Sequence, residues 1–193
     1  MVSSLCVLLL LGNLFVIGNA ACPTIISRSQ WGARPPKGTP TKLPSPPVPY
    51  AVIHHGGSNA YCSTQTSCAA IVRSYQNHHI DTNGWNDIGY NFVVGEDGNV
   101  YEGRGWDNFG AHEPAYNSRS IGICIIGDFT ARLPNQAALN AVRQLIQCGV
   151  EKNKIRSNYS LKGHRQGGST SCPGNRLYQE LTTWPRWTSG REK

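Results

Sequence analysis

The sequence lacks three features that would identify common classes of protein. Its longest hydrophobic runs fall short of the roughly 20 apolar residues that a membrane-spanning helix needs, so we expect no membrane span. It has no HExxH motif, which argues against a thermolysin-like zinc protease. It also has no run of five or more basic residues and no nucleic-acid motif, so nucleic acid is not an expected partner.

The first twenty residues differ in composition from the rest. Met1 to Ala20 carry no charged residue, and an apolar stretch from Leu8 to Ile17 is interrupted at Gly12-Asn13. Small residues follow at Gly18-Asn19-Ala20, the spacing that a signal peptidase recognises. A basic segment at the start is missing, but the pattern still predicts a signal peptide over 1–20. The mature protein is therefore expected to be secreted and extracellular.

Acidic residues are few in the remaining chain. There are 11 Asp and Glu against 18 Lys and Arg, all after residue 20, which gives a formal net charge of +7. A basic extracellular protein is suited to anionic polymers such as the bacterial cell wall. A charge that serves solubility alone is the alternative.

Length and pattern predict one α/β domain, a mixed central β-sheet flanked by helices. Prolines make 21–49 an irregular N-terminal arm, followed by the domain over 50–187 and a tail over 188–193. Strands are expected at 50–55, 90–94, 100–103, 120–127 and 161–164. Helices are expected at 64–79, from Pro134 to a stop at Gly149, and at 177–184.

Six cysteines remain once Cys6 leaves with the signal peptide. Three disulfides would be the usual expectation for a secreted chain. We predict only two: a local Cys62–Cys68 bridge and a Cys22–Cys148 bridge from the arm to the long helix. Cys124 lies in the most apolar strand, where a thiol behaves as a small hydrophobic group. Cys172 is then left without a partner in a polar loop.

Metal binding would explain Cys172. His164 precedes it by eight residues, and zinc accepts imidazole and thiolate together. A catalytic zinc keeps three protein ligands and a water, so a third ligand is needed. His54 and His55 end a strand, where neighbouring side chains point to opposite faces, so only one of them can face His164. Structural histidines with a third disulfide are the alternative.

Six segments in order resemble the peptidoglycan recognition proteins, which belong with the type 2 N-acetylmuramoyl-L-alanine amidases. The resemblance extends over about 25–187. The segments are AVIHH at 51–55, GWNDIGYNF at 84–92, YEGRGW at 101–106, GAH at 110–112, SIGI at 120–123, and KGHR through CPG over 162–174.

The resemblance implies a site and a reaction. The metal ligands would be His54, His164 and Cys172, holding one Zn²⁺ per chain. Tyr90 and Thr170 would be catalytic. The reaction would be hydrolysis of the amide between N-acetylmuramic acid and L-alanine of the stem peptide by a zinc-activated water, in antibacterial innate immunity.

Peptidoglycan and its muramyl peptides are the expected partners. Arg104 and Arg119 are candidates for a stem-peptide carboxylate, and Trp106 suits the core equally well. The sequence carries no signal for an oligomeric state. The residues expected to contact the substrate are His55, Trp106, His112, Tyr116, Asn117 and Arg165.

Two alternatives remain within this resemblance. The family also contains recognition proteins and signalling receptors that bind peptidoglycan without hydrolysing it, and such members typically lack the cysteine ligand. The intact set of His54, His164 and Cys172 therefore favours an enzyme. A purely structural zinc is disfavoured because Tyr90 and Thr170 match catalytic positions.

Overall fold

A computed structural model describes residues 22–190. The predicted signal peptide over 1–20 and the last three residues of the predicted tail lie outside the described residues. Within 22–190, no helix combines the length and apolar character needed to cross a bilayer.

One mixed six-stranded sheet forms the centre of the protein, in the order β1-β4-β3-β5-β2-β6. Only β3 and β4 pair antiparallel; the other neighbours are parallel. The predicted fold class is therefore confirmed. The strands are β1 (Ile25–Ile26), β2 (Val48–His55), β3 (Phe92–Val94), β4 (Val100–Glu102), β5 (Ser120–Ile125) and β6 (Ile155–Gly163).

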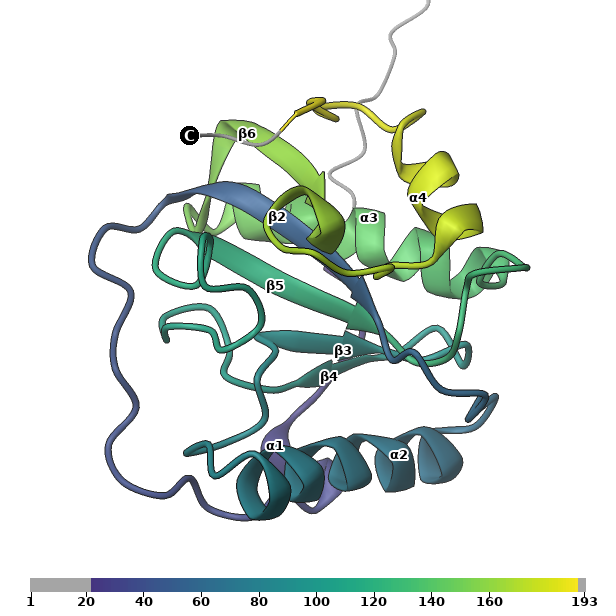
Figure 1. Ribbon diagram of the computed structural model, residues 1–193. Helices are drawn as coiled ribbons and strands as arrows, with labels where there is room; N and C mark the ends of the chain where they lie inside the picture. Colours follow the sequence, from purple (N-terminus) through teal and green to yellow (C-terminus); the bar gives the residue numbers. More distant parts are fainter. Residues whose placement is uncertain (1–21, 191–193) are drawn as a thin grey trace, which may run out of the picture.

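Helices cover both faces of this sheet (Figure 1). On one face lie α1 (Arg28–Trp31), α2 (Gln65–Asn77) and the π-helical turn that continues α2 (His78–Thr82). On the other face lie α3 (Gln136–Glu151) and α4 (Asn175–Leu181). A short 3-10 helix, His164–Gln166, follows β6 directly.

Side-chain alternation along β2 divides the core between the two faces. Ala51 and Ile53 pack in the cluster shared with α3 and α4. Val52 and His54 therefore face the side of the sheet that carries α1 and α2. This second face, between β5 and β6, is where the polar residues of the candidate site gather.

Long-range contacts give the N-terminal arm more structure than its prolines predict. It contains β1, α1 and the start of β2, and β1 pairs with the edge strand β4. Trp31 is fully buried, and its Nε1 donates to the Glu102 carbonyl at 2.8 Å. The Cys22–Cys148 disulfide ties the arm to α3, and Cys62 bonds to Cys68. Both predicted bridges are confirmed, and Cys124 and Cys172 are free and buried.

Several element boundaries shift by two or three residues from those predicted, and two differences have a structural cause. Helix α3 continues through Gly149 to Glu151, because Gly149 is a packing residue: a Cβ there would lie 2.7 Å from Ile155 and 2.8 Å from Trp106. Strand β6 spans nine residues rather than four. Its early residues, 156–160, are polar and largely solvent-facing at the sheet edge, so they lack the hydrophobic pattern used to find strands.

Candidate metal centre

The three predicted metal ligands come together on the second face of the sheet. One ligand atom from each of His54, His164 and Cys172 lies within 4.8 Å of the others. His54 is near the end of β2 and His164 directly follows β6. Because β2 and β6 run parallel, their carboxyl ends meet at the same edge. Cys172 reaches this edge from the loop before α4.

The ring of His164 presents one nitrogen to this centre. Its Nε2 lies 3.0 Å from a carboxylate oxygen of Glu113. Its Nδ1 is buried and has no hydrogen-bond partner in the described protein. A buried imidazole nitrogen without a partner is costly unless something binds it. The free Nδ1 therefore fits a metal ligand.

A chain of hydrogen bonds fixes the tautomer of His54. The Ser120 hydroxyl donates to the Tyr116 carbonyl at 2.8 Å, so it can only accept from His112 Nε2, 3.2 Å away. Neutral His112 then has a bare Nδ1, which accepts from His54 Nε2 at 2.9 Å. His54 is left with a bare Nδ1, and this atom lies 3.9 Å from Cys172 Sγ.

Backbone groups hold the Cys172 thiol in place. The Sγ atom accepts from the His55 N–H at 3.3 Å, and the backbone N–H of Cys172 donates to Thr170 Oγ1 at 3.1 Å. Burial raises the pKa of Cys172 to about 12, although the His55 N–H opposes that shift. Without a cation the group is a neutral thiol at pH 7, so metal binding would release its proton.

This donor set fits zinc. Two bare imidazole nitrogens and one thiol converge, and three such ligands leave a fourth position for water. Burial is the main cause that lowers the pKa of both His54 and His164, so both rings stay neutral and able to bind a metal. The second nitrogen of each ring bonds to Glu113 or His112, as is usual for metal-binding histidines.

Tyr90 lies beside the cluster. Its ring centre is 5.3 Å from that of His54. Burial, reinforced by Cys124 and Cys172, raises the pKa of Tyr90 well above its usual value. Its hydroxyl therefore stays protonated and can donate a hydrogen bond, whereas it cannot act as a base near neutral pH. Thr170 is exposed at the same site and accepts from the Cys172 N–H.

Three predicted substrate contacts belong to the loop between β4 and β5. His112 is 8% exposed and holds His54. The side-chain oxygen of Asn117 accepts from the N–H groups of His112 and Glu113. Tyr116 is 1% exposed, and its ring packs edge-on against Tyr50. These residues support the site from the protein side.

The structure places two other predicted contacts away from the cluster. The His55 ring points to the opposite face, where its Nδ1 accepts from the Phe129 N–H at 3.2 Å, because neighbouring strand residues alternate. Trp106 packs on Phe92, with ring centres 4.4 Å apart, in the core shared with α3. Neither side chain faces the cluster, so contact of His55 or Trp106 with the substrate stays a prediction.

Arg165 supports the cysteine loop. Its guanidinium donates to the carbonyls of Cys172 and Ser171 and to Asn175, and it lies over the Tyr178 ring. The sequence reasoning missed Glu113 and Ser120, the two residues that end the hydrogen-bond chains. Both lie within eight residues of His112, but nothing in their local pattern marks them as buried partners of a histidine.

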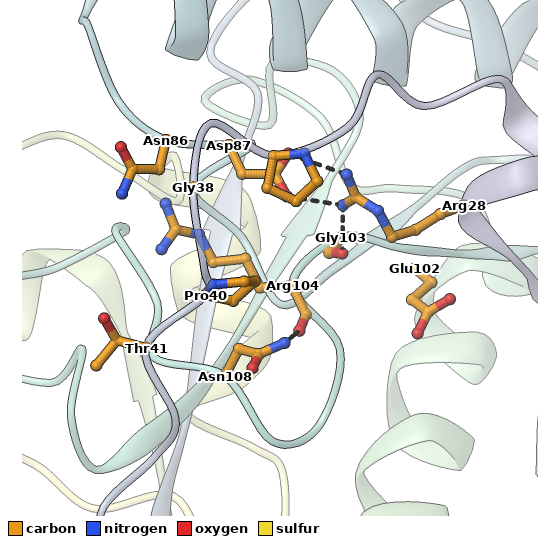
Figure 2. A pocket seen from close by; sticks show the side chains of 11 residues that line it. Arg28, Gly38, Pro40, Thr41, Asn86, Asp87, Glu102, Gly103, Arg104 and Asn108 are labelled. Atoms are coloured by element: carbon orange, nitrogen blue, oxygen red, sulfur yellow. Dashed lines mark hydrogen bonds and ion pairs between the residues drawn. The ribbon is translucent and has the colours of Figure 1, made fainter.

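A separate cavity of about 140 Å³ lies between the N-terminal arm and the loop after β4 (Figure 2). Arg28 enters it and bonds to Asp87 and to the Gly103 carbonyl. Arg104 donates from its side chain to the carbonyls of Ile88 and Phe109. No residue of the His54 cluster lines this cavity, and we assign the contacts of Arg28 to anchoring the arm.

The buried side chain of His79 leads us to predict that the fold loses stability at acidic pH. Burial lowers the pKa of His79 to about 4, and its Nδ1 accepts from the Gly89 N–H at 3.0 Å. In the unfolded chain the His79 ring takes up a proton near pH 6.5. The free energy of unfolding therefore falls as the pH is lowered from about 6.5 to about 4. Uptake of one such proton on unfolding changes the free energy of unfolding by at most about 1.4 kcal/mol per pH unit.

Urea unfolding between pH 7 and 4, with a chelator present, checks this expectation. His79→Gln should flatten the dependence of unfolding free energy on pH, because one buried histidine no longer has to stay neutral. His78→Gln removes an exposed histidine from the same turn and is the matched control. Identical slopes for the wild type and His79→Gln would contradict the assignment.

Comparison with known proteins agrees with this geometry. Residues 44–175 match the N-acetylmuramoyl-L-alanine amidase family. The chain is 49% identical over 170 residues to a human N-acetylmuramoyl-L-alanine amidase, covering 87% of this chain but only 29% of that protein. It is 44% identical to peptidoglycan-recognition protein SC2 of Drosophila melanogaster, covering 93% of this chain and 96% of that one.

Solved structures give the same result. Peptidoglycan recognition protein LE in complex with tracheal cytotoxin, a monomeric diaminopimelic acid-type peptidoglycan, superposes with a TM-score of 0.83. The two are 45% identical, over 86% of this chain and 96% of that one. Bumblebee peptidoglycan recognition protein SA superposes with a TM-score of 0.84 at 41% identity, over 88% of this chain and 99% of that one.

Proposed function

Because this chain belongs to the N-acetylmuramoyl-L-alanine amidase family and is related along most of its length to peptidoglycan-recognition proteins, we propose that it is a zinc-dependent amidase of bacterial peptidoglycan. It would hydrolyse the amide between N-acetylmuramic acid and the L-alanine of the stem peptide. The observation that carries the proposal is the convergence of one ligand atom from each of His54, His164 and Cys172 within 4.8 Å of one another.

Each residue has a distinct proposed role. His54, His164 and Cys172 hold one Zn²⁺. When bound, the ion supplies Lewis acidity and a water of lowered pKa. The protonated Tyr90 hydroxyl donates a hydrogen bond to the substrate carbonyl oxygen as negative charge develops on it. Thr170 fixes the backbone of Cys172 and, from its exposed position, orients the attacking water.

The ligand is proposed to be a muramyl peptide. Solved relatives were crystallised with tracheal cytotoxin, which supports this class of ligand. Arg119 lies over the rings of Tyr50 and Tyr116 beside the loop that holds His112, where its charge is available to a stem-peptide carboxylate. Two disulfides and the composition of the first twenty residues support action outside the cell.

One experiment separates an amidase from a protein that only binds peptidoglycan. Metal content of the purified protein is measured together with release of stem peptide from muropeptides. We expect about one zinc per chain, loss of hydrolysis with a chelator, and recovery when zinc is restored. A protein that binds muropeptides but holds no zinc and releases no peptide would instead be a recognition protein.

Tyr90→Phe tests the donor role. Removing one positioned donor to a developing oxyanion lowers kcat by about 100- to 1000-fold. Zinc content and muropeptide affinity should stay near wild type, because the hydroxyl is not a metal ligand and the ring remains. Tyr61→Phe is the matched control, since its hydroxyl bonds the Asp128 carbonyl outside the cluster. Full turnover by Tyr90→Phe would exclude this role.

A further inference from the structure

We propose that Glu113 is a positioning residue of the metal centre, which holds the His164 ring in one tautomer and one orientation. The inference rests on the proposed function, in which His164 is a metal ligand. Glu113 does not itself face the ligand atoms; it acts through the far side of the His164 ring.

The carboxylate of Glu113 is buried beside the His164 ring. The residue is 4% exposed, and one carboxylate oxygen lies 3.0 Å from His164 Nε2. The other accepts from the Ala115 N–H at 3.2 Å. Within residues 22–190, no Lys or Arg forms an ion pair with Glu113. Burying a carboxylate costs free energy, so we expect its contact with His164 to have a role that offsets this cost.

Two glycines make room for this carboxylate. A Cβ on Gly167 would lie 2.5 Å from Glu113 Cγ and 2.6 Å from Cδ. A Cβ on Gly168 would lie 2.7 Å from Glu113 Oε2. The turn after His164 therefore packs its bare backbone onto the Glu113 side chain. The same turn leads to Cys172, so Glu113 lies beneath the link between two proposed ligands.

Hydrogen-bond chemistry explains what the contact does. A neutral imidazole carries one N–H, and an ionised carboxylate can only accept. Glu113 therefore selects the ring form with the proton on Nε2, which leaves the Nδ1 lone pair for the metal. The negative charge also increases the basicity of the ring as a ligand. Without Glu113 the ring can carry its proton on Nδ1, and that form cannot bind a metal through Nδ1.

A single loop orients both histidines. His112 and Ser120 set the tautomer of His54, and Glu113, the next residue after His112, sets that of His164. Asn117 holds this part of the loop in place by accepting from the N–H groups of both His112 and Glu113. The loop between β4 and β5 thus supplies the outer support for both imidazole ligands.

Zinc affinity is the first measurement. By competition with a chelator, Glu113→Ala should weaken zinc binding about 10- to 100-fold. Glu113→Gln should lie between it and the wild type, because an amide oxygen still accepts from Nε2 but lacks the charge. Glu180→Gln is the matched control: it breaks an ion pair with Arg143 away from the cluster and should leave zinc affinity unchanged.

Long-range ¹H–¹⁵N spectra of the metal-free protein give a second readout that a loss of stability would not move. The His164 ring should be protonated on Nε2 in the wild type and should populate the Nδ1–H form in the Glu113 variants. Wild-type zinc affinity in both variants would overturn the inference. If the wild type binds no zinc, the proposed function fails, and the tautomer alone decides the role of Glu113.

Discussion

Cys172→Ser is expected to abolish amide hydrolysis while leaving the fold intact. The substitution removes the only thiolate among the three proposed ligands, and a serine hydroxyl is a poor replacement for it on zinc. The metal contributes several kcal/mol to the reaction, and each 1.4 kcal/mol is a factor of ten in rate. We therefore expect turnover to fall about a thousandfold or more.

The fold should survive because serine keeps the contacts that Cys172 makes to the backbone. Its oxygen can accept from the His55 N–H, and its own N–H still bonds Thr170. With a chelator present, unfolding midpoints of the variant and the wild type should be similar, and muropeptide binding should persist. Cys124→Ser, which removes the second free thiol within residues 22–190, should retain bound zinc.

Three measurements decide this prediction: zinc per chain, released stem peptide, and affinity for insoluble peptidoglycan. Hydrolysis at the wild-type rate in Cys172→Ser would remove the cysteine from the reaction. Loss of both hydrolysis and binding, with a normal unfolding midpoint, would mean that the thiol serves ligand binding rather than the metal.

Replacing the Cys22–Cys148 bridge by two alanines should cause the largest loss of stability. The bridge closes a loop of 126 residues, and the chain-entropy model gives about 5 kcal/mol for a loop of that length. The bridge also holds the arm that carries β1 and Trp31 against the sheet. The free energy of unfolding in urea is the measurement.

The second bridge is the matched control. Cys62 and Cys68 are only six residues apart, for which the same model gives about 2 kcal/mol. Replacing both by alanine removes two sulfurs from the same protein but restricts the unfolded chain far less. Equal losses for the two double variants would show that local packing, rather than loop closure, determines the contribution of each bridge.

Local sequence patterns located the main elements and the two bridges. The two adjacent histidines at the end of an apolar strand, and a histidine and a cysteine joined by a glycine-rich loop, indicated a metal site on chemical grounds but left the choice between His54 and His55 open; the resemblance to the family supplied the ligand set. The six ordered segments then indicated the family. These features are short-range, because strand alternation and zinc-ligand chemistry depend on residue type and spacing.

Other features were decided by contacts between distant residues. Alternation required that His54 and His55 point to opposite faces, but only the parallel pairing of β2 and β6 showed that His54 faces His164. Gly149 looked like a helix stop and is a packing residue against Trp106, while Trp106 itself is partly buried and packs against the core. A one-dimensional pattern carries no information about which partner fills the space beside a residue.

The sequence by itself determined which types of side chain could bind a metal, namely imidazoles and one thiol, among residues that otherwise form an ordinary α/β domain. Only the tertiary structure decided which nitrogen of each ring is free. That choice depends on the hydrogen bond that the opposite nitrogen of each ring makes. His112, 58 residues after His54, bonds the His54 ring, and Glu113, which lies well before His164 in the chain, bonds the His164 ring. Proton position in a histidine is set by its neighbours in space, which chain order does not specify.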